Sequence, residues 1–298
     1  MEMLTLSHVA KNFGEKQVLR DVSFSVPEHT VFGFVGQNGA GKTTAMKMIL
    51  GLLTISSGEI TLNGMPVCYG NTPTNRLVGY LPDVPEFYPY MTPAEYLRFC
   101  GEVSGISAKE IKSRSQELLR LVGLDKENHR IKGFSRGMKQ RLGVAQALLG
   151  RPKLLICDEP TSALDPAGRK ELLDILTAAK EETTVLFSTH ILSDVEHICD
   201  EMAFLHEGKI AVKGTLDEVR RMRRETAVAV ETEHPKDAGT LQQAFPFLKS
   251  NGKNRLLLEE AGRLPELLHF IADREIAVMR IERQEATLED LFMEVIGK

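Results

Sequence analysis

The sequence predicts an α/β fold in which helices cover a parallel sheet, with antiparallel strands before it and a small second α/β domain after it. Residues 151–160 and 182–190 are apolar segments of strand length, and the segment 166–181 between them has a helical pattern. Such alternation of strand and helix is typical of a parallel sheet with helical cover. Residues 30–53 add a buried strand, a Gly-rich turn and a helix.

Antiparallel strands are expected near the N-terminus. Residues 3–14 and 16–29 alternate between polar and apolar side chains, as half-buried strands do. Residues 58–67 have the pattern of a hairpin whose turn is Asn63-Gly64, a dipeptide suited to tight two-residue turns. We therefore expect an N-terminal antiparallel β subdomain.

The middle of the first domain is expected to be helical, from Thr92 to about Leu149. Thr92 precedes Pro93 and Glu95 in the arrangement of a capped helix start, with proline at the first helical position. Residues 107–124 form an amphipathic pattern whose helix is expected to end at Gly123. We expect a helical subdomain at about residues 84–150.

The last quarter of the chain has the order β-α-β-β-α-β, which is ferredoxin-like. The expected elements are a strand at 226–232, a helix at 235–245, a hairpin within 247–260, a helix at 263–275, a strand at 276–283 and a final helix at 287–297. We therefore expect two domains, residues 1–220 and 225–298. No catalytic constellation is evident in the second.

An arginine cluster marks the junction of the two domains. Its members are Arg220, Arg221, Arg223 and Arg224. Charge clusters of this kind are usually the solvated end of a helix, which is the interpretation we favour. A patch that binds phosphate or a membrane surface is the alternative.

The overall composition excludes several classes of protein. The chain has 298 residues, with 37 Lys plus Arg and 41 Asp plus Glu, so its formal net charge is −4. A charge of this sign does not suggest a general nucleic-acid binder. The four cysteines are too widely spaced for a metal or redox pair. The N-terminal segment lacks the character of a signal peptide, and no apolar run approaches the roughly 18 residues that span a bilayer.

The Gly-rich turn carries the first candidate site. Its sequence, GQNGAGKTT, matches the pattern G-x-x-x-x-G-K-[ST] between a buried strand and a helix. Glycines allow unusual backbone angles and leave room for phosphate against bare N–H groups, and the following helix directs its positive end to the same place. The lysine would contact the β- and γ-phosphates, and the first threonine would offer its hydroxyl to Mg²⁺. The candidate residues are Gly36, Asn38, Gly39, Ala40, Gly41, Lys42, Thr43 and Thr44. This pattern predicts a P-loop NTPase sheet that binds a nucleoside triphosphate.

Two neighbouring strand ends carry the candidate catalytic groups. Asp158 and Glu159 end one buried strand, and His190 ends the next. Ligands bind at the carboxyl ends of strands in open α/β sheets, and adjacent carboxylates repel one another unless a cation is near. We expect Asp158 to hold Mg²⁺, Glu159 to polarise the attacking water, and His190 to reach the γ-phosphate. Solvated strand ends are the structural alternative.

A Ser-x-Gly helix start precedes the first of these strands. Ser135 has no neighbouring base that would make it a nucleophile, but it can cap the helix and present a hydroxyl to an anion. Gly137 has no side chain, so the backbone there can approach a phosphate closely. On a chain that already has a phosphate loop, this start is either an ordinary N-cap or a second surface for a phosphate.

The order of these motifs resembles that of the ATP-binding subunit of ABC transporters. GQNGAGKTT, FSRGMKQR, LLICDEP, SALD and STH follow one another within roughly residues 1–220. The chain looks closest to the bacterial exporter subfamily that includes antibiotic- and drug-resistance ATPases. Its tail, ATLEDLFMEVIG, is similar to the ending of the small C-terminal domain in that subfamily.

The resemblance implies roles for further residues. Ser135 and Gly137 match the signature motif, which closes over ATP held by a second ATPase subunit. Phe13 matches the aromatic residue that stacks on adenine, and Asp165 matches the loop that links the two sites of the dimer. Asp83 aligns with a glutamine that contacts Mg²⁺ or its water.

Two departures from the family pattern matter. The signature usually reads Leu-Ser-Gly-Gly, but here it reads Phe134-Ser135-Arg136-Gly137, and Arg136 adds a positive charge. Asp83 is shorter than the usual glutamine and is anionic, but it can still contact Mg²⁺ or its water, so we keep Asp83 with Thr43 and Asp158 as a candidate metal residue.

The resemblance implies a Mg²⁺-dependent, ATP-hydrolysing motor subunit, most simply of an exporter, at the cytoplasmic face of the membrane. Its partners would be a membrane-spanning subunit and a second ATP-binding subunit in a homodimer, with no nucleic acid. The alternatives are a non-transport ABC ATPase acting on ribosomes or DNA, and a P-loop kinase or GTPase. The single phosphate loop and the short helical insertion argue against the first, and the signature argues against the second.

Overall fold

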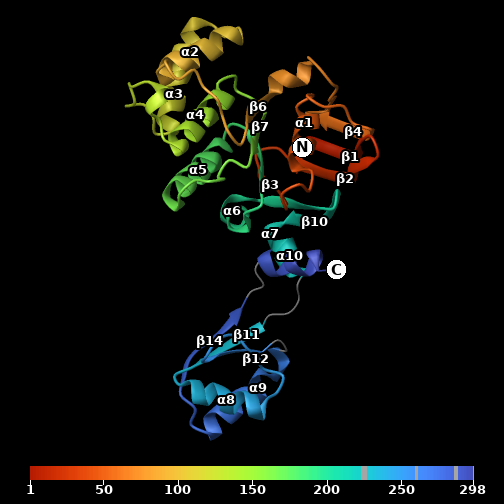
Figure 1. Cartoon of the computed structure of the whole chain (residues 1–298), viewed down its shortest axis with the longest axis vertical. Coiled ribbons are helices and arrows are strands. Elements are labelled where there is room, and N and C mark those ends of the chain that lie inside the picture. Colours follow the sequence, from red (N-terminus) through yellow and green to blue (C-terminus); the bar gives the residue numbers. More distant parts are fainter. Residues whose placement is uncertain (223–226, 259–260, 285–287, 298) are drawn as a thin grey trace. The chain divides into compact units, whose positions relative to one another are not determined.

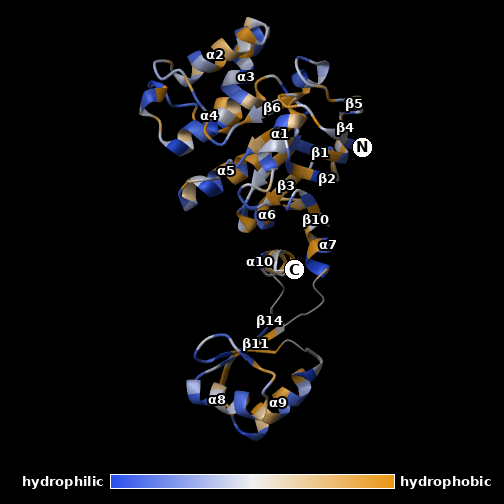
Figure 2. Cartoon of the chain, turned by 45° about the vertical axis from the view of Figure 1, so that its right-hand side comes forward, coloured by the Kyte–Doolittle hydropathy of each residue, from blue (hydrophilic) through white to orange (hydrophobic). Residues whose placement is uncertain are grey.

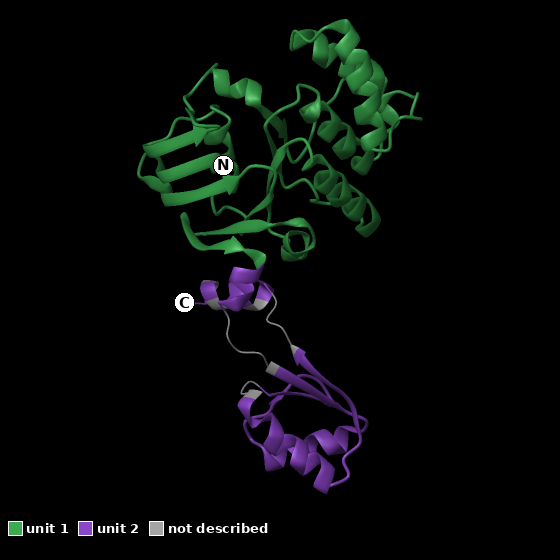
Figure 3. Cartoon of the chain, turned by 180° about the vertical axis from the view of Figure 1, so that it is seen from behind, with its two compact units in different colours: residues 1–216 green, residues 217–298 purple. Residues whose placement is uncertain are grey.

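The structure, a computed structural model, describes residues 1–222, 227–258, 261–284 and 288–297. The chain divides into two compact units, residues 1–216 and 217–298 (Figure 3). We expected this division a few residues later, at the arginine cluster. Of that cluster, Arg223 and Arg224 lie outside the described residues.

The first unit is built on one sheet in the order β5-β4-β1-β2-β10-β9-β3-β8-β7-β6. Its strands are β1 (Glu2–Phe13), β2 (Lys16–Pro27), β3 (Val31–Gly36), β4 (Ser57–Leu62), β5 (Met65–Pro66), β6 (Val78–Leu81), β7 (Leu154–Asp158), β8 (Thr184–Thr189), β9 (Glu201–His206) and β10 (Lys209–Thr215). Strands β6, β7, β8, β3 and β9 pair in parallel, whereas β1, β2, β4 and β5 pair antiparallel. Both the parallel sheet and the antiparallel β subdomain are thus as the sequence predicts.

Helices of the first unit lie beside this sheet (Figure 1). They are α1 (Lys42–Ile49), α2 (Pro93–Val103), α3 (Ala108–Leu121), α4 (Arg136–Leu148), α5 (Pro166–Ala179) and α6 (Leu192–Ile198), with short 3₁₀ turns η1 (Pro73–Leu77) and η2 (Ile131–Gly133). Figure 1 shows α2, α3 and α4 together on the β6 side of the sheet, away from β1, β2 and β4. Thr92 and Glu95 form the expected capping box of α2. Hydrophobic and hydrophilic residues alternate along α4 and α5, as expected for helices that bury one side (Figure 2).

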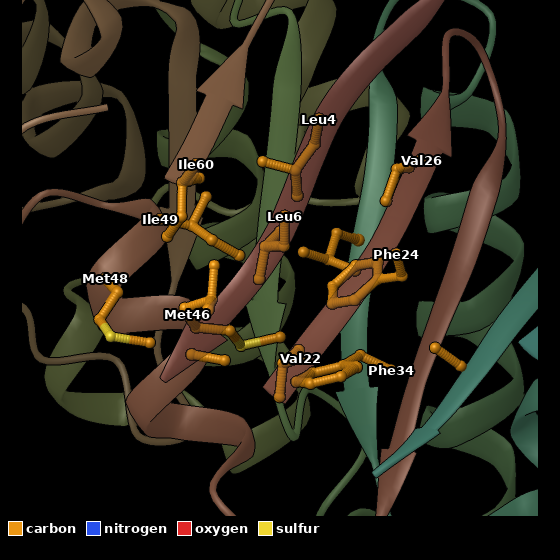
Figure 4. Close-up of a cluster of buried hydrophobic side chains, with 14 of the residues drawn as sticks. Leu4, Leu6, Val22, Phe24, Val26, Phe34, Met46, Met48, Ile49 and Ile60 are labelled. Carbon is orange, nitrogen blue, oxygen red and sulfur yellow. The ribbon is translucent and has the colours of Figure 1, made fainter. Parts of the chain in front are cut away.

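The core of the first unit fixes the start of the phosphate loop. Met46 and Ile49 on α1 are fully buried against side chains of the N-terminal strands (Figure 4). The ring of Phe24 on β2 stacks on Phe34 of β3 with a centroid distance of 5.3 Å. Because β3 and α1 both belong to this core, the turn between them is held at both ends.

The second unit is ferredoxin-like, as predicted. Its elements are α7 (Leu216–Arg221), β11 (Ala227–Thr232), α8 (Pro235–Ala244), β12 (Lys249–Ser250), β13 (Arg255–Leu258), η3 (Ala261–Arg263), α9 (Leu264–Asp273), β14 (Val278–Gln284) and α10 (Leu288–Ile296). The sheet order is β12-β13-β11-β14 with antiparallel neighbours. Leu241 of α8 and Leu267 of α9 are buried against Val230 and Leu256 of the sheet.

Some parts of the fold were not predicted. The sequence interpretation omitted the short edge strand β6, the helix α6, and the hairpin of β9 and β10. Strand β6 is important for the site because the chain continues from it to Asp83. Within the described part of the chain, no helix is both long and apolar enough to cross a bilayer.

Candidate active site

The phosphate loop joins β3 to α1, and its glycines serve different purposes. Gly39 and Gly41 have φ angles of 84° and 111°, which other residues rarely adopt. Gly36 does not need an unusual angle, contrary to our expectation, because it is required for space. A Cβ at Gly36 would lie 2.6 Å from the carbonyl oxygen of Leu205 on the neighbouring strand.

A cavity of about 510 Å³ opens over this loop. Its lining comes from the phosphate loop and the start of α1, from the start of β2, from the end of β7 and from the turn between β9 and β10. The lining residues are Lys16, Gln17, Val18, Arg20, Asn38, Gly39, Ala40, Gly41, Lys42, Thr43, Thr44, Glu159, Glu207 and Gly208. Candidate phosphate-binding residues therefore meet the candidate catalytic base in one cavity.

Lys42 is buried at the base of the cavity, with 6% of its surface exposed. Its Nζ donates to the carbonyl oxygen of Gly36 at 2.6 Å and lies 3.1 Å from Oε1 of Glu159. A buried ammonium needs paired charge because desolvation is costly. In this arrangement Glu159 supplies the negative charge that a phosphate would supply.

Thr43 and Asp158 lie beside Lys42 and present oxygen atoms together. The Thr43 hydroxyl donates to Oδ2 of Asp158 at 2.9 Å, and the Ser188 hydroxyl donates to Oδ1 at 2.7 Å. Burial, together with the nearby Asp158 carboxylate, raises the pKa of Tyr80 to about 12, so its hydroxyl stays protonated. Hydroxyl and carboxylate oxygens of this kind suit Mg²⁺, which usually keeps waters and substrate phosphates as its other ligands.

Glu159 and His190 form a pair at the carboxyl ends of β7 and β8. Nδ1 of His190 lies 2.8 Å from Oε2 of Glu159. The backbone of Glu159 has a φ angle of 47°, a conformation that a residue with a side chain adopts only under constraint. Its N–H donates to the Ser188 hydroxyl at 3.0 Å, which helps to hold that conformation.

A buried carboxylate behind this pair was missed by the sequence interpretation. Asp194 on α6 is 1% exposed, and its Oδ2 accepts a hydrogen bond from the Thr161 hydroxyl at 2.6 Å. Its Oδ1 accepts from Nε of Arg169 on α5. Because Thr161 follows Glu159 by two residues and Asp194 follows His190 by four, this network ties together the two loops that carry the pair.

We expect Asp194→Asn to slow ATP turnover by about tenfold while changing the KM for ATP much less, because small misplacements of catalytic groups are costly. The amide cannot accept from both Thr161 and Arg169. Steady-state phosphate release measures both parameters. Glu171→Gln is the matched control. Glu171 also pairs with an arginine, Arg141 at 3.6 Å, but its side chain is far more exposed than that of Asp194. Equal rates for wild type and Asp194→Asn would contradict a positioning role.

Ser135, Gly137 and Asp165 are not among the residues that line the cavity over the phosphate loop. Ser135 caps α4 by accepting from the N–H of Met138 at 3.2 Å, and Asp165 caps α5 by accepting from the N–H of Gly168 at 2.9 Å. A Cβ at Gly137 would meet only a Leu164 methyl at 4.0 Å, so the backbone there is open. These residues can therefore contact a molecule that is not bound in the chain's own phosphate site.

Phe13 lies at the end of β1, 48% exposed and outside the lining of the cavity. Nζ of Lys11 lies 5.0 Å from the centre of its ring. The stacking of Phe13 on adenine therefore stays a prediction.

Asp83 is also not brought to the candidate metal ligands. Its carboxylate accepts a hydrogen bond from the hydroxyl of Ser162, and its Oδ1 lies 3.6 Å from Nη2 of Arg136. In this structure the Asp83 carboxylate contacts Ser162 and Arg136, and its grouping with Thr43 and Asp158 as a metal contact stays a prediction.

A phosphate loop on a parallel sheet flanked by helices, with an acidic strand end beside it, defines a P-loop nucleoside triphosphatase. The ABC transporter family model matches residues 19–162, and the model for the C-terminal domain of DrrA1-3-like ATP-binding proteins matches residues 214–296. The chain belongs to the ATP-binding proteins of ABC transporters and is an ABC-type ATPase.

Individual relatives agree over almost the whole chain. The uncharacterized ABC transporter ATP-binding protein YxlF of Bacillus subtilis (strain 168) is 39% identical, covering 99% of both chains. The bacitracin transport ATP-binding protein BcrA of Bacillus licheniformis is 34% identical, covering 99% of this chain and 97% of the relative. A solved ATP-binding subunit of an ABC transporter is 35% identical with a TM-score of 0.66, covering 74% of this chain and 92% of that one.

Proposed function

We propose that this chain is the motor subunit of an ABC exporter, which closes on ATP as a head-to-tail homodimer and drives a separate membrane-spanning subunit. One observation carries the proposal. Lys42 and Glu159 meet in one cavity, whereas Ser135 and Gly137 form an open helix start outside it. These features support a chain that has a phosphate loop of its own and offers a second surface, which a partner's nucleotide would occupy.

Binding of the triphosphate begins with an exchange at Lys42. Its ammonium is paired with Glu159 at 3.1 Å, and both side chains are largely buried. An arriving β- or γ-phosphate competes for the ammonium and releases the Glu159 carboxylate. Because Glu159 remains beside His190, it is then held next to the terminal phosphate, where it can accept a proton from the attacking water.

Thr43 and Asp158 are the residues that would hold Mg²⁺. Their oxygens are 2.9 Å apart and face one another at the end of β7 and the start of α1. The ion would neutralise charge that develops on the phosphates during transfer. Asp158 would be kept in orientation by the hydrogen bond from Ser188.

The membrane partner and the direction of transport rest on similarity. BcrA is by its name a bacitracin transport protein, and its whole length resembles this chain, including the C-terminal unit. We therefore place the chain at the cytoplasmic face of the membrane, bound to a membrane-spanning subunit, with export as the direction. We assign the C-terminal unit a regulatory or dimer-stabilising role, and we expect no nucleic acid as a partner.

ATP-driven dimerisation tests the proposal. The Glu159→Gln chain, which retains nucleotide, should be a dimer with Mg-ATP and a monomer without it, as measured by light scattering. Adding Gly137→Asp should keep it monomeric, because bulk and negative charge would lie where phosphate must approach. Gly150→Asp is the matched control at the other end of α4, where a Cβ meets no neighbour within 4 Å. Dimers of the Gly137→Asp chain would contradict the shared site.

A further inference from the structure

Three segments that are distant in sequence meet at the hydroxyl of Ser162. This hydroxyl donates to Oδ1 of Asp83 and accepts from Nη2 of Arg136 at 3.4 Å, and the two charged groups lie 3.6 Å apart. Asp83 follows β6, Ser162 follows β7, and Arg136 is the first residue of α4. Asp83 and Arg136, two of the residues at which the sequence departs from the family pattern, are therefore in contact with each other.

Ser162 and Arg136 are each close in sequence to a candidate functional residue. Ser162 follows Glu159 by three residues, and its N–H donates to the Glu159 carbonyl oxygen at 3.0 Å. Arg136 follows Ser135 directly. The contact therefore links the loop of the catalytic base to the signature helix.

The backbone of Asp83 is held in this position by a buried side chain of α4. Its carbonyl oxygen accepts a hydrogen bond of 2.6 Å from Nε2 of Gln140, which is fully buried on α4. To reach Thr43 and Asp158, the Asp83 carboxylate would have to leave both Ser162 and Arg136. The geometry thus directs Asp83 toward the signature helix.

Electrostatics explain why Arg136 can exchange its partner Asp83 for a phosphate. A positive side chain at the N-terminus of a helix is unfavourable because it faces the positive end of the helix dipole, and the Asp83 carboxylate offsets this. Both side chains are about half exposed, so the pair is weak. A phosphate offers a guanidinium a stronger, charge-assisted partner than a half-exposed carboxylate does.

We propose that Asp83 and Ser162 hold the Arg136 guanidinium through this contact until a nucleotide bound to a second subunit replaces them as its partner. We name this contact the Arg136 latch. It deepens the proposed function and rests on the shared site. Asp83 acts through Arg136, as a positioning residue, and the phosphate that reaches Ser135 draws the guanidinium away from Asp83 and Ser162.

A double-mutant cycle tests the Arg136 latch. All four chains are full length and carry Glu159→Gln, and the ATP concentration at half-maximal dimerisation is measured by light scattering at saturating Mg²⁺. Asp83→Asn should lower this concentration about threefold, because it frees Arg136 from a weak ion pair. Arg136→Gln should raise it about threefold, because it removes a phosphate contact. In the Arg136→Gln background, Asp83→Asn should have no effect.

Two further variants keep the test decisive. Ser162→Ala removes the bridging hydroxyl without altering charge, and it should also lower the half-maximal ATP concentration. If the Asp83→Asn chain does not fold, Ser162→Ala takes its place in the cycle. Glu102→Gln breaks a comparable exposed pair, Arg98–Glu102 at 2.7 Å on α2, and should change nothing. Equal melting temperatures across the set exclude a merely structural effect.

The opposing results are distinct. If Asp83→Asn shifts the half-maximal concentration equally in both backgrounds, the latch is wrong. If Asp83→Asn raises the Mg²⁺ concentration needed for dimerisation, whether or not Arg136 is present, Asp83 is a metal ligand instead. If the Glu159→Gln parent stays monomeric with Mg-ATP, both the shared site and the Arg136 latch are wrong. If the parent dimerises but the effects of Asp83→Asn and Arg136→Gln are additive, only the latch is wrong.

Discussion

The Glu159→Gln chain should bind Mg-ATP at least as tightly as the wild type and hydrolyse it at least about a hundredfold more slowly, since a general base contributes on the order of 10²–10⁴. Glutamine keeps the shape of the side chain but cannot accept the proton of the attacking water. Loss of the carboxylate also removes the group that pairs with Lys42 at 3.1 Å, so an incoming phosphate has no competitor. Phosphate release measures turnover, and a fluorescent ATP analogue measures binding.

A second carboxylate in the same cavity provides the control. Glu207 lines the cavity at the turn between β9 and β10, and it is an exposed residue. Glu207→Gln removes one negative charge from the cavity without touching Lys42 or His190, so turnover should stay within about twofold of the wild type, as for a surface substitution. If Glu159→Gln and Glu207→Gln slowed turnover alike, the effect would come from the charge of the cavity, and Glu159 would lose its assigned role.

The parts of the site that the sequence could predict are those fixed by strand order. Lys42, Asp158 and His190 each follow or end a buried strand, and parallel strands place their carboxyl ends at one edge. Predicting the strands therefore sufficed to bring the residues together. The pairing of Lys42 with Glu159 was not predicted, because it depends on the left-handed backbone of Glu159, which has no signal in the sequence.

The parts that could not be predicted depend on side chains that meet through loops. Asp83 and Ser162 are 79 residues apart, and Thr161 and Asp194 are 33 apart. No periodic pattern relates such positions, and the edge strand β6 that directs Asp83 was itself missed. Alignment by resemblance assigned Asp83 to the metal, but alignment cannot show that Asp83 contacts Ser162 and Arg136.

In a mixture of two inactive chains, ATPase activity should return. Lys42→Ala destroys the phosphate loop, because Lys42 is the buried cation of the cavity. Gly137→Asp destroys the signature start but has room in the fold, since a Cβ at Gly137 meets only a Leu164 methyl at 4.0 Å. Each variant alone should be inactive, and each should remain folded.

The mixed dimer combines one intact phosphate loop from the Gly137→Asp chain with one intact signature from the Lys42→Ala chain. With random pairing, half of the dimers are mixed and each has one complete site of two, so about a quarter of the wild-type activity is expected. If Ser135 and Gly137 served their own chain's nucleotide, every site in the mixture would still be broken and activity would stay at background. A cooperative enzyme that needs two intact sites would also stay silent, so the same pair is examined with Glu159→Gln in both chains for dimerisation driven by ATP. Pairing without turnover would place the signature on the partner's nucleotide and make hydrolysis cooperative, whereas the absence of both would mean that each chain uses its own signature.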